Sequence, residues 1–227
     1  MNNGWLLQSG PGDAAFNMAA DEALLAFLPQ WRAPVLRFYG WTQPAATFGY
    51  FQKWAEVAAA TRLRPLVRRP TGGGLVPHEA DWTYSVAFPA GHEWHGLRAV
   101  ESYRRVHDWL RLAFAECGVA TELASDAQKP QPGQCFIGHE KFDLLWRGQK
   151  IAGAAQRRNQ LGLLIQGSVQ PPPVPLARAA LEAALCAVAA AQWQVRWTPL
   201  PPDAAWRARV EELRLHKYAQ ENYNARR

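Results

Sequence analysis

The chain has 227 residues, of which 48% are hydrophobic and 19% are charged, and its formal net charge is +6. At a soft prior of about 150 residues per domain, this length predicts one globular domain, residues 1–227, with a core large enough to be stable without disulfide bonds. The three cysteines are an odd number without Cys-x-x-Cys spacing. They exclude a disulfide framework and a zinc knuckle, and they favour a reducing compartment.

Charge and hydropathy narrow the class of protein further. The sequence has neither a basic start followed by a long apolar stretch nor any run of 18 apolar residues. We therefore expect a cytoplasmic protein that does not enter the membrane. A pI near 9.5 favours an anionic partner. Basic residues occur in pairs, without the longer runs of nucleic-acid-binding arms, so we expect no nucleic acid among the partners.

The first half of the chain predicts short strands around one long helix. The helix is predicted to begin after the N-cap residue Asp13 and to end at Pro29. A short helix is predicted at 53–61. Aromatic and β-branched residues predict strands at 5–7, 35–39, 45–49 and 66–69. The last of these runs into the glycine-rich segment 70–74, and the alternating residues 82–88 predict the strand that returns from it.

The second half predicts helices on either side of an antiparallel meander. Helices are predicted at 98–117, 177–191 and 203–215. Strands are predicted at 142–146, 150–156 and 161–169, with turns at 147–148 and 158–160, and a further strand at 195–197. Hairpins that alternate with a few helices predict the α+β class, with a mixed, largely antiparallel β-sheet flanked by helices.

Segment 68–78, Arg-Arg-Pro-Thr-Gly-Gly-Gly-Leu-Val-Pro-His, is the first that carries chemical information. Three consecutive glycines after a basic pair let the backbone approach a ligand closely, with N–H groups free to bind an anion or an acyl carbonyl. The spacing is neither that of a P-loop nor Gly-x-Gly-x-x-Gly. The alternative interpretation is a flexible turn with solvated arginines, and the alternative for His78 is a structural hydrogen-bonding role.

Two further positions carry reactive side chains. Lys150 begins an apolar strand, and on a buried face it needs an anionic or thiol partner; a snorkelling edge-strand lysine is the alternative. Cys135 lies on a Pro/Gly-rich loop 15 residues before Lys150. A nearby ammonium favours the thiolate, which is the nucleophile in acyl transfer. Cys117 and Cys186 lie on predicted helices, where we expect them to be core residues.

Together these segments resemble the lipoate–protein ligase and octanoyltransferase group of the biotin/lipoate ligase superfamily. The resemblance covers most of the chain and rests on five motifs in order: Asn-Met-Ala-Ala-Asp-Glu-Ala-Leu-Leu at 17–25, Phe-Tyr-Gly-Trp at 38–41, Phe-Gly-Tyr-Phe-Gln at 48–52, Arg-Arg-x-Thr-Gly-Gly-Gly at 68–74 and Lys-x-x-Gly-x-Ala-Gln at 150–156. It implies the catalytic-domain fold of biotin and lipoate protein ligases, in which the glycine loop and the Lys150 strand line a tunnel for an octanoyl or lipoyl chain.

Within this group the chain is most similar to the cysteine-dependent octanoyltransferases, whose Cys-Phe precedes the lysine motif at the spacing seen here. The resemblance implies that Cys135 takes octanoyl from acyl carrier protein as a thioester and passes it to a lysine of a lipoyl domain or of glycine-cleavage H protein. Lys150 would be the general base and thiolate partner. No metal and no cofactor is expected. The implied substrate-binding residues are Arg69, Thr71, Gly72, Gly73, Gly74, His78, Gly153 and Ala154.

Two departures from that branch leave the acyl donor open. Gly74 stands where that branch more often has arginine, and a glycine at this position is a feature shared with the ligases. Gln166 stands where histidine is common before Gly167. The alternatives are an ATP-dependent lipoate–protein ligase, which would need ATP and Mg, an amidotransferase that takes octanoyl from H protein, and a binding or scaffolding protein without the chemistry. The residues after His78 lack the Gly-Asn pair that such ligases usually carry, which favours the transferase.

Overall fold

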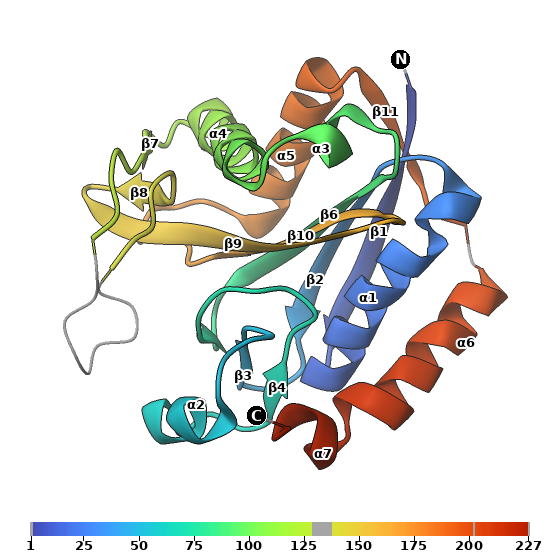
Figure 1. Cartoon of the computed structure of the whole chain (residues 1–227). Helices are drawn as coiled ribbons and strands as arrows, with labels where there is room; N and C mark the ends of the chain where they lie inside the picture. Colours follow the sequence, from blue (N-terminus) through green and yellow to red (C-terminus); the bar gives the residue numbers. More distant parts are fainter. Residues whose placement is uncertain (1, 129–137, 202, 227) are drawn as a thin grey trace.

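The computed structural model describes residues 2–128, 138–201 and 203–226. These residues form a mixed sheet of eight strands and a small sheet of three strands, with helices on both faces of the large sheet (Figure 1). The strands of the large sheet, in spatial order, are β11 (Val195–Pro199), β1 (Asn2–Gly12), β2 (Val35–Trp41), β6 (Trp82–Pro89), β10 (Gly162–Val169), β9 (Gln149–Asn159), β8 (Leu144–Trp146) and β7 (Glu122–Leu123).

The pairing within the large sheet confirms the predicted α+β class. β1 runs parallel to both β2 and β11, and every other neighbouring pair is antiparallel. Successive side chains of a strand point to opposite faces, which divides the core in two. Leu36 and Phe38 of β2 belong to the core under one helical layer, and Val35 belongs to the core under the other.

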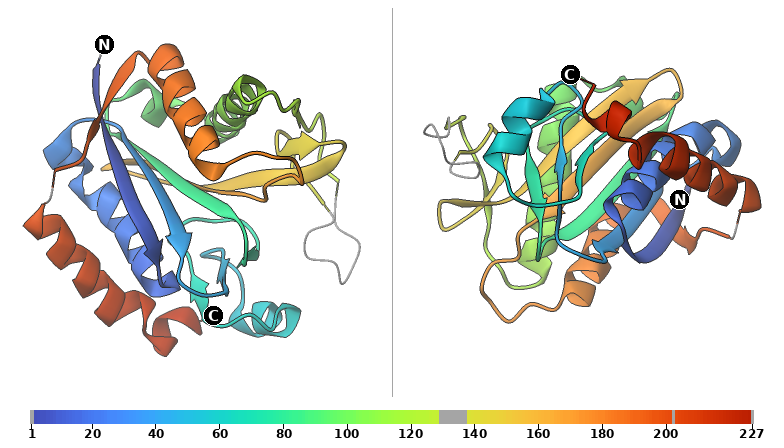
Figure 2. Two further views of the ribbon diagram at one scale, coloured as in Figure 1. Left: turned by 180° about the vertical axis from the view of Figure 1, so that it is seen from behind. Right: turned by 90° about the horizontal axis from the view of Figure 1, so that it is seen from below.

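Helices α4 (Ala99–Glu116) and α5 (Arg178–Gln192), with the short α3 (Glu93–Gly96), cover one face of the sheet. Helix α1 (Ala14–Trp31) covers the other, and α6 (Ala204–Leu213) lies along it (Figure 2). The Asp13 side chain accepts a hydrogen bond from the Phe16 N–H at 2.7 Å, which confirms the predicted N-cap. The predicted end at Pro29 is wrong, since the helix continues to Trp31 and ends at Arg32, whose N–H donates to the Leu28 carbonyl. One missing backbone hydrogen bond is outweighed by packing of this last turn, in which Leu28 is fully buried.

The small sheet lies on the same side of the large sheet as α1 (Figure 1). It consists of β4 (Leu66–Arg68), β3 (Ala45–Phe48) and β5 (Val76–His78), with β3 in the centre. β4 and β6 were predicted as the strand that enters the glycine segment and the strand that returns from it. Instead, β5 returns into the small sheet antiparallel to β3, and β6 then crosses to the large sheet. Helix α2 (Trp54–Ala60) connects β3 to β4.

The predicted meander is formed by β8, β9 and β10, which are neighbours in the sheet. Arg147 and Gly148 connect β8 to β9, and both have positive φ, of 50° and 74°. Such a two-residue turn matches the twist of the flanking strands and fixes their register. Leu145 is thereby paired with Lys150. The chain ends, within the described residues, in the π-helical turn η1 (Arg214–Tyr218) and α7 (Glu221–Asn224).

Candidate active site

A cavity of about 290 Å³ lies between the two sheets. The large sheet contributes residues 150–155 of β9 and Gln166 of β10 to its wall, and the small sheet contributes Thr47 and His78. The glycine loop, α1, α4, β2, β6 and the residues on either side of 129–137 also contribute to the wall. Strands of both sheets and two helices therefore fix the wall, so its geometry does not depend on one loop.

The glycine loop reaches the cavity because two backbone segments touch without side chains between them. A Cβ on Gly49 would lie 1.9 Å from the carbonyl oxygen of Gly73, and Gly73 itself has φ of +85°. Both positions therefore require glycine, one for the close approach and one for the left-handed backbone. A Cβ at Gly72 or Gly74 would meet no atom within 4 Å. The Gly74 position therefore has space for a side chain larger than that of glycine.

Arg69 holds this loop in place. Its Nη2 donates to the carbonyls of Gly72 and Gly74, at 2.7 and 2.8 Å, and its Nη1 donates to Thr47 Oγ1 at 3.2 Å. Burial lowers the pKa of Arg69 to about 10, so the guanidinium stays charged at neutral pH. Hydrogen bonds from a charged donor to the two loop carbonyls are stronger than neutral ones. Arg69 therefore acts on the shape of the loop as well as lining the cavity.

His78 is fixed by a chain of hydrogen bonds at the cavity wall. Its Nε2 lies 2.8 Å from Thr47 Oγ1 and its Nδ1 lies 2.8 Å from Asp81 Oδ2, which also accepts from Ser168 Oγ. The ring stacks on Trp41 at a centroid distance of 3.7 Å. Burial lowers the pKa of His78 and outweighs Asp81, which raises it. His78 thus combines a place on the cavity wall with the structural role that the sequence left open.

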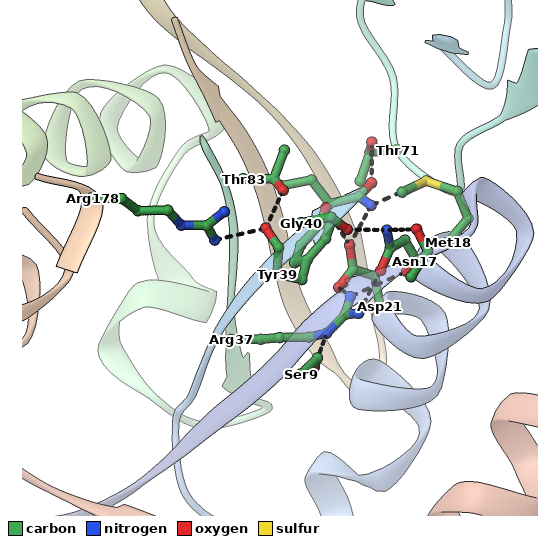
Figure 3. A network of polar contacts seen from close by, with 12 residues as sticks. Ser9, Asn17, Met18, Asp21, Arg37, Tyr39, Gly40, Thr71, Thr83 and Arg178 are labelled. Atoms are coloured by element: carbon green, nitrogen blue, oxygen red, sulfur yellow. Dashed lines mark hydrogen bonds and ion pairs between the residues drawn. The ribbon is translucent and has the colours of Figure 1, made fainter. Parts of the chain in front are cut away.

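Thr71 anchors the base of the glycine loop to the core. Its hydroxyl donates to Gln166 Oε1 at 2.6 Å, and Gln166 Nε2 donates to Asp21 Oδ2 at 2.7 Å. Asp21 is also paired with Arg37 at 2.7 Å, and both side chains are fully buried (Figure 3). Tyr39 donates a further hydrogen bond to Asp21. Removing one partner of such a buried pair costs about 3–5 kcal/mol, so this network holds α1, β2 and the loop in one arrangement.

Lys150 meets a buried carboxylate at the edge of the cavity. Its Nζ lies 2.7 Å from Oδ2 of Asp143, whose side chain is fully buried, while the Lys150 side chain is 24% exposed. Asp143 also accepts hydrogen bonds from the Tyr103 hydroxyl and from the Glu140 N–H. A Cβ on Gly153 would lie 2.9 Å from Lys150 Cε and 3.0 Å from Nζ, so glycine there leaves room for the lysine.

Most of the predicted site residues come together. Cys135 lies outside the described residues. Thr71 and Gly72 are not among the residues that line the cavity. The predicted residues that do line it are Arg69, Gly73, Gly74, His78, Lys150, Gly153 and Ala154.

Asp143 and Tyr103 were not predicted as site residues. A carboxylate between apolar neighbours in the predicted strand 142–146 was the available signal for Asp143. The sequence offered no signal for Tyr103, because a tyrosine on an amphipathic helix is common.

The described residues contain neither a cluster of metal-ligating side chains nor a helix that could span a membrane. In residues 2–128, 138–201 and 203–226, no three His, Cys, Asp or Glu side chains gather as metal ligands would. In the same ranges, no helix has both the length and the apolar character that crossing a bilayer requires. The expectations of no metal and of a cytoplasmic protein stay predictions.

Residues 13–171 match the family model of the lipoyl protein ligase A/B catalytic domain. The match spans more than half of the chain and includes both the glycine loop and the lysine strand. The chain therefore belongs to this family, which confirms the resemblance seen in its motifs.

Individual relatives refine this assignment. The chain is 34% identical over 170 residues to octanoyltransferase LipM of Exiguobacterium sibiricum, covering 69% of this chain and 62% of the relative. It is 37% identical over 161 residues to octanoyltransferase LipM of Carboxydothermus hydrogenoformans, covering 68% and 60%. The chain thus spans somewhat less than two thirds of the length of these relatives.

One solved structure with a similar fold is that of a bi-partite lipoate protein ligase and its E2 lipoyl domain from Thermoplasma acidophilum. Its TM-score is 0.76 at 19% identity, and the match covers 99% of this chain and 97% of that one. At this identity the likeness shows the fold alone. It confirms the predicted fold of a lipoate ligase catalytic domain over nearly the whole chain.

Proposed function

We propose that this protein is an octanoyltransferase, which moves an octanoyl group from a carrier-protein thioester to a lysine of a lipoyl domain or of glycine-cleavage H protein. The observation that carries the proposal is the Lys150 ammonium at the wall of a cavity between two sheets, next to the glycine loop. The names of the relatives support octanoyl transfer as the reaction. The finer steps rest on the chemistry of the site residues.

The cavity suits an acyl chain with a reactive end. Its volume of about 290 Å³ lies near the lower limit for small-ligand sites, and apolar residues such as Met18, Ile151 and Ala152 contribute to its wall. Arg69 and the glycine-loop backbone lie on another side. An octanoyl chain would bury its methylenes against the apolar residues, and its carbonyl would face the N–H groups of the glycine loop.

Cys135 is the proposed nucleophile. Gln128 and His139, which bound the segment that contains it, both line the cavity and are paired by backbone hydrogen bonds of 2.8 and 3.1 Å. Cys135 precedes Gly138 of the cavity wall by three positions, which corresponds to about 11 Å of extended chain at most. The other two thiols are poorer nucleophiles, because burial and then Glu182 raise the pKa of Cys186 to about 11, and burial raises that of Cys117.

The proposed reaction has two displacements and keeps every proton accounted for. The Cys135 thiolate, paired with the Lys150 ammonium, attacks the thioester carbonyl, and the carrier thiol leaves with a proton from Lys150. Neutral Lys150 then accepts the proton that the attacking lysine amine of the acceptor loses. The amide forms, the Cys135 thiolate leaves, and the ion pair is restored. Lys150 is thus an acid in the first step and a base in the second.

The charge of the protein supports acidic partners. The formal net charge of +6 would attract acyl carrier protein and lipoyl domains, which resemble one another in being acidic, and would speed their encounter. The similar T. acidophilum structure belongs to an archaeal lipoylation system that consists of a bi-partite lipoate protein ligase and its E2 lipoyl domain. A lipoyl domain is therefore the acceptor that we propose, with H protein as its equivalent.

Intact-protein mass spectrometry tests the proposal. The protein is mixed with octanoyl-acyl carrier protein without ATP, beside a Cys135→Ser variant. We expect a hydroxylamine-labile octanoyl adduct on the native protein and none on the variant. Attachment of free octanoate to a lipoyl domain only when ATP is added would refute the transferase and favour the ligase. An adduct formed from octanoyl-H protein but not from octanoyl-acyl carrier protein would favour the amidotransferase.

A further inference from the structure

Lys150 is held in one position from two directions. Asp143 Oδ2 lies 2.7 Å from its Nζ, and Gly153 leaves the space that the end of the lysine side chain occupies. A lysine has four rotatable bonds and is otherwise a poorly ordered group. An ammonium that must give up and take back a proton gains from a fixed location, since a displacement of about 1 Å can cost about 100-fold in rate.

We infer that Asp143 and Tyr103 are positioning residues for octanoyl transfer, which hold the Lys150 ammonium at the cavity wall. This inference rests on the proposed function and adds two residues to its machinery. Neither residue is assigned contact with the substrate. Asp143 acts by its ion pair with Lys150, and Tyr103 acts by fixing Asp143.

Asp143 is suited to this role because it is itself immobilised. It is fully buried directly before β8, where its Oδ2 accepts the Glu140 N–H at 2.7 Å and its Oδ1 accepts the Tyr103 hydroxyl. Burial, and then the charge of Asp143, raise the pKa of Tyr103 far above its usual value. The tyrosine therefore keeps its proton and remains a donor to the carboxylate at all working pH values.

The ring of Tyr103 is fixed in turn by His107. The two ring centroids are 4.3 Å apart, and His107 Nδ1 lies 2.9 Å from the Tyr103 carbonyl oxygen. Burial lowers the pKa of His107 to about 4, so the imidazole is neutral. A neutral ring adds no second cation beside Lys150, which leaves Asp143 with one charged partner among the described contacts.

The chain offers a matched control with the same chemistry. Glu22 accepts from Lys217 Nζ at 2.6 Å and from the Tyr218 hydroxyl at 2.6 Å, and none of these three residues lines the cavity. Substitutions in this second triad remove the same kinds of bond at a site that the reaction does not use. They separate a loss of positioning from a general loss of stability.

The first experiment measures steady-state octanoyl transfer to a lipoyl domain for Asp143→Asn, with Glu22→Gln as its control. We expect kcat to fall about 10- to 100-fold for Asp143→Asn, with KM for the donor within about threefold of the native value. Tyr103→Phe is expected to have a smaller effect of the same kind. Glu22→Gln is expected to leave both parameters unchanged. An unchanged kcat in Asp143→Asn overturns the inference.

The second experiment asks whether Asp143 acts through Lys150. Asp143→Asn is introduced into a Lys150→Met background, and the residual rates are compared as a double-mutant cycle. We expect no further loss in the double variant, because the group that Asp143 holds is already gone. A loss as large as in the native background overturns the inference, since Asp143 would then act independently of the lysine.

A third variant covers the case in which Asp143→Asn does not fold. Gly153→Ala leaves every charge in place, but its Cβ occupies the space of Lys150 Cε and Nζ. We expect a reduced kcat with a thermal melting profile close to the native one; a native kcat contradicts the need for a fixed ammonium.

The native protein is assayed in parallel with all variants. If it forms no octanoyl adduct, the proposed function itself fails, whatever the variants do.

Discussion

Two groups of three residues in this molecule have the same chemistry and different surroundings. Lys150, Asp143 and Tyr103 form one of them, and Lys217, Glu22 and Tyr218 form the other. In each, an ammonium and a phenol hydroxyl converge on one carboxylate. Both lysine side chains are 24% exposed.

The difference lies in what surrounds each lysine. Asp143 is fully buried and Lys150 lies on the cavity wall, whereas Glu22 is 18% exposed and joins α1 to η1. Glu22 also has a second cation, Arg157, at 3.5 Å. An ion pair between two helices contributes to the stability of their contact. An ion pair beside a cavity can in addition present its charge to a ligand. Bonding pattern alone therefore does not distinguish the two lysines, whereas the cavity beside Lys150 does.

The largest expected difference between the two groups is in activity. Lys150→Met is expected to lower octanoyl transfer at least about 100-fold, because the proton donor and acceptor is lost. Lys217→Met is expected to leave transfer unchanged and to lower the melting temperature. Rates with a lipoyl-domain acceptor and thermal melts of both variants provide the measurement. Equal losses of activity in the two variants would remove the distinction that we draw.

The second prediction concerns stability and pH. Burial raises the pKa of Glu22, but Lys217 and Tyr218 together lower it by more. The pKa therefore lies below 4.5 in the folded protein. The stabilisation that the Glu22 carboxylate gives the folded protein is then present above about pH 4.5 and is lost as the pH falls through the folded-state pKa. Glu22→Gln should cost about 1–3 kcal/mol at pH 7, and less at pH 3.5. Urea unfolding at the two pH values measures this, and a constant difference would show that the carboxylate charge is not the cause.

The smallest expected effect is that of Tyr218→Phe. It removes one hydrogen bond from Glu22 and leaves Lys217 in place, so we expect a loss of about 1 kcal/mol in unfolding free energy and no change in transfer. Urea unfolding and the transfer assay are run on the same preparation. A fall in transfer as large as that of Tyr103→Phe would show that the second group also supports the reaction.

The sequence predicted those elements whose signals are local. The Asp13 cap, the turn at Arg147 and Gly148 and the meander of β8 to β10 all depend on neighbouring residues, and the structure confirms them. Pairing across the glycine loop depends on distant segments. The placement of β5 against β3, and of β6 in the large sheet, was therefore missed.

The site was predictable where a motif marks it. The glycine loop and Lys150 were found in this way. An anionic or thiol partner was predicted for Lys150, but Asp143 was not identified as that anion, because the ion pair arises only when a hairpin turn folds β8 against β9. The division of roles within the loop was also missed, since the hydrogen bond of Thr71 to Gln166 joins residues far apart in sequence.

The position of β1 also affects how the chain is made. β1 pairs with β2 on one side, while its other side pairs with β11, from Asn2 opposite Val195 to Leu6 opposite Pro199. During synthesis that outer edge stays unpaired until Val195–Pro199 has been made, and unpaired strand edges promote aggregation. Pairing between such distant segments is slow. Although β1 precedes β2 in the chain, its pairing in the sheet is complete only when β11 has folded against it.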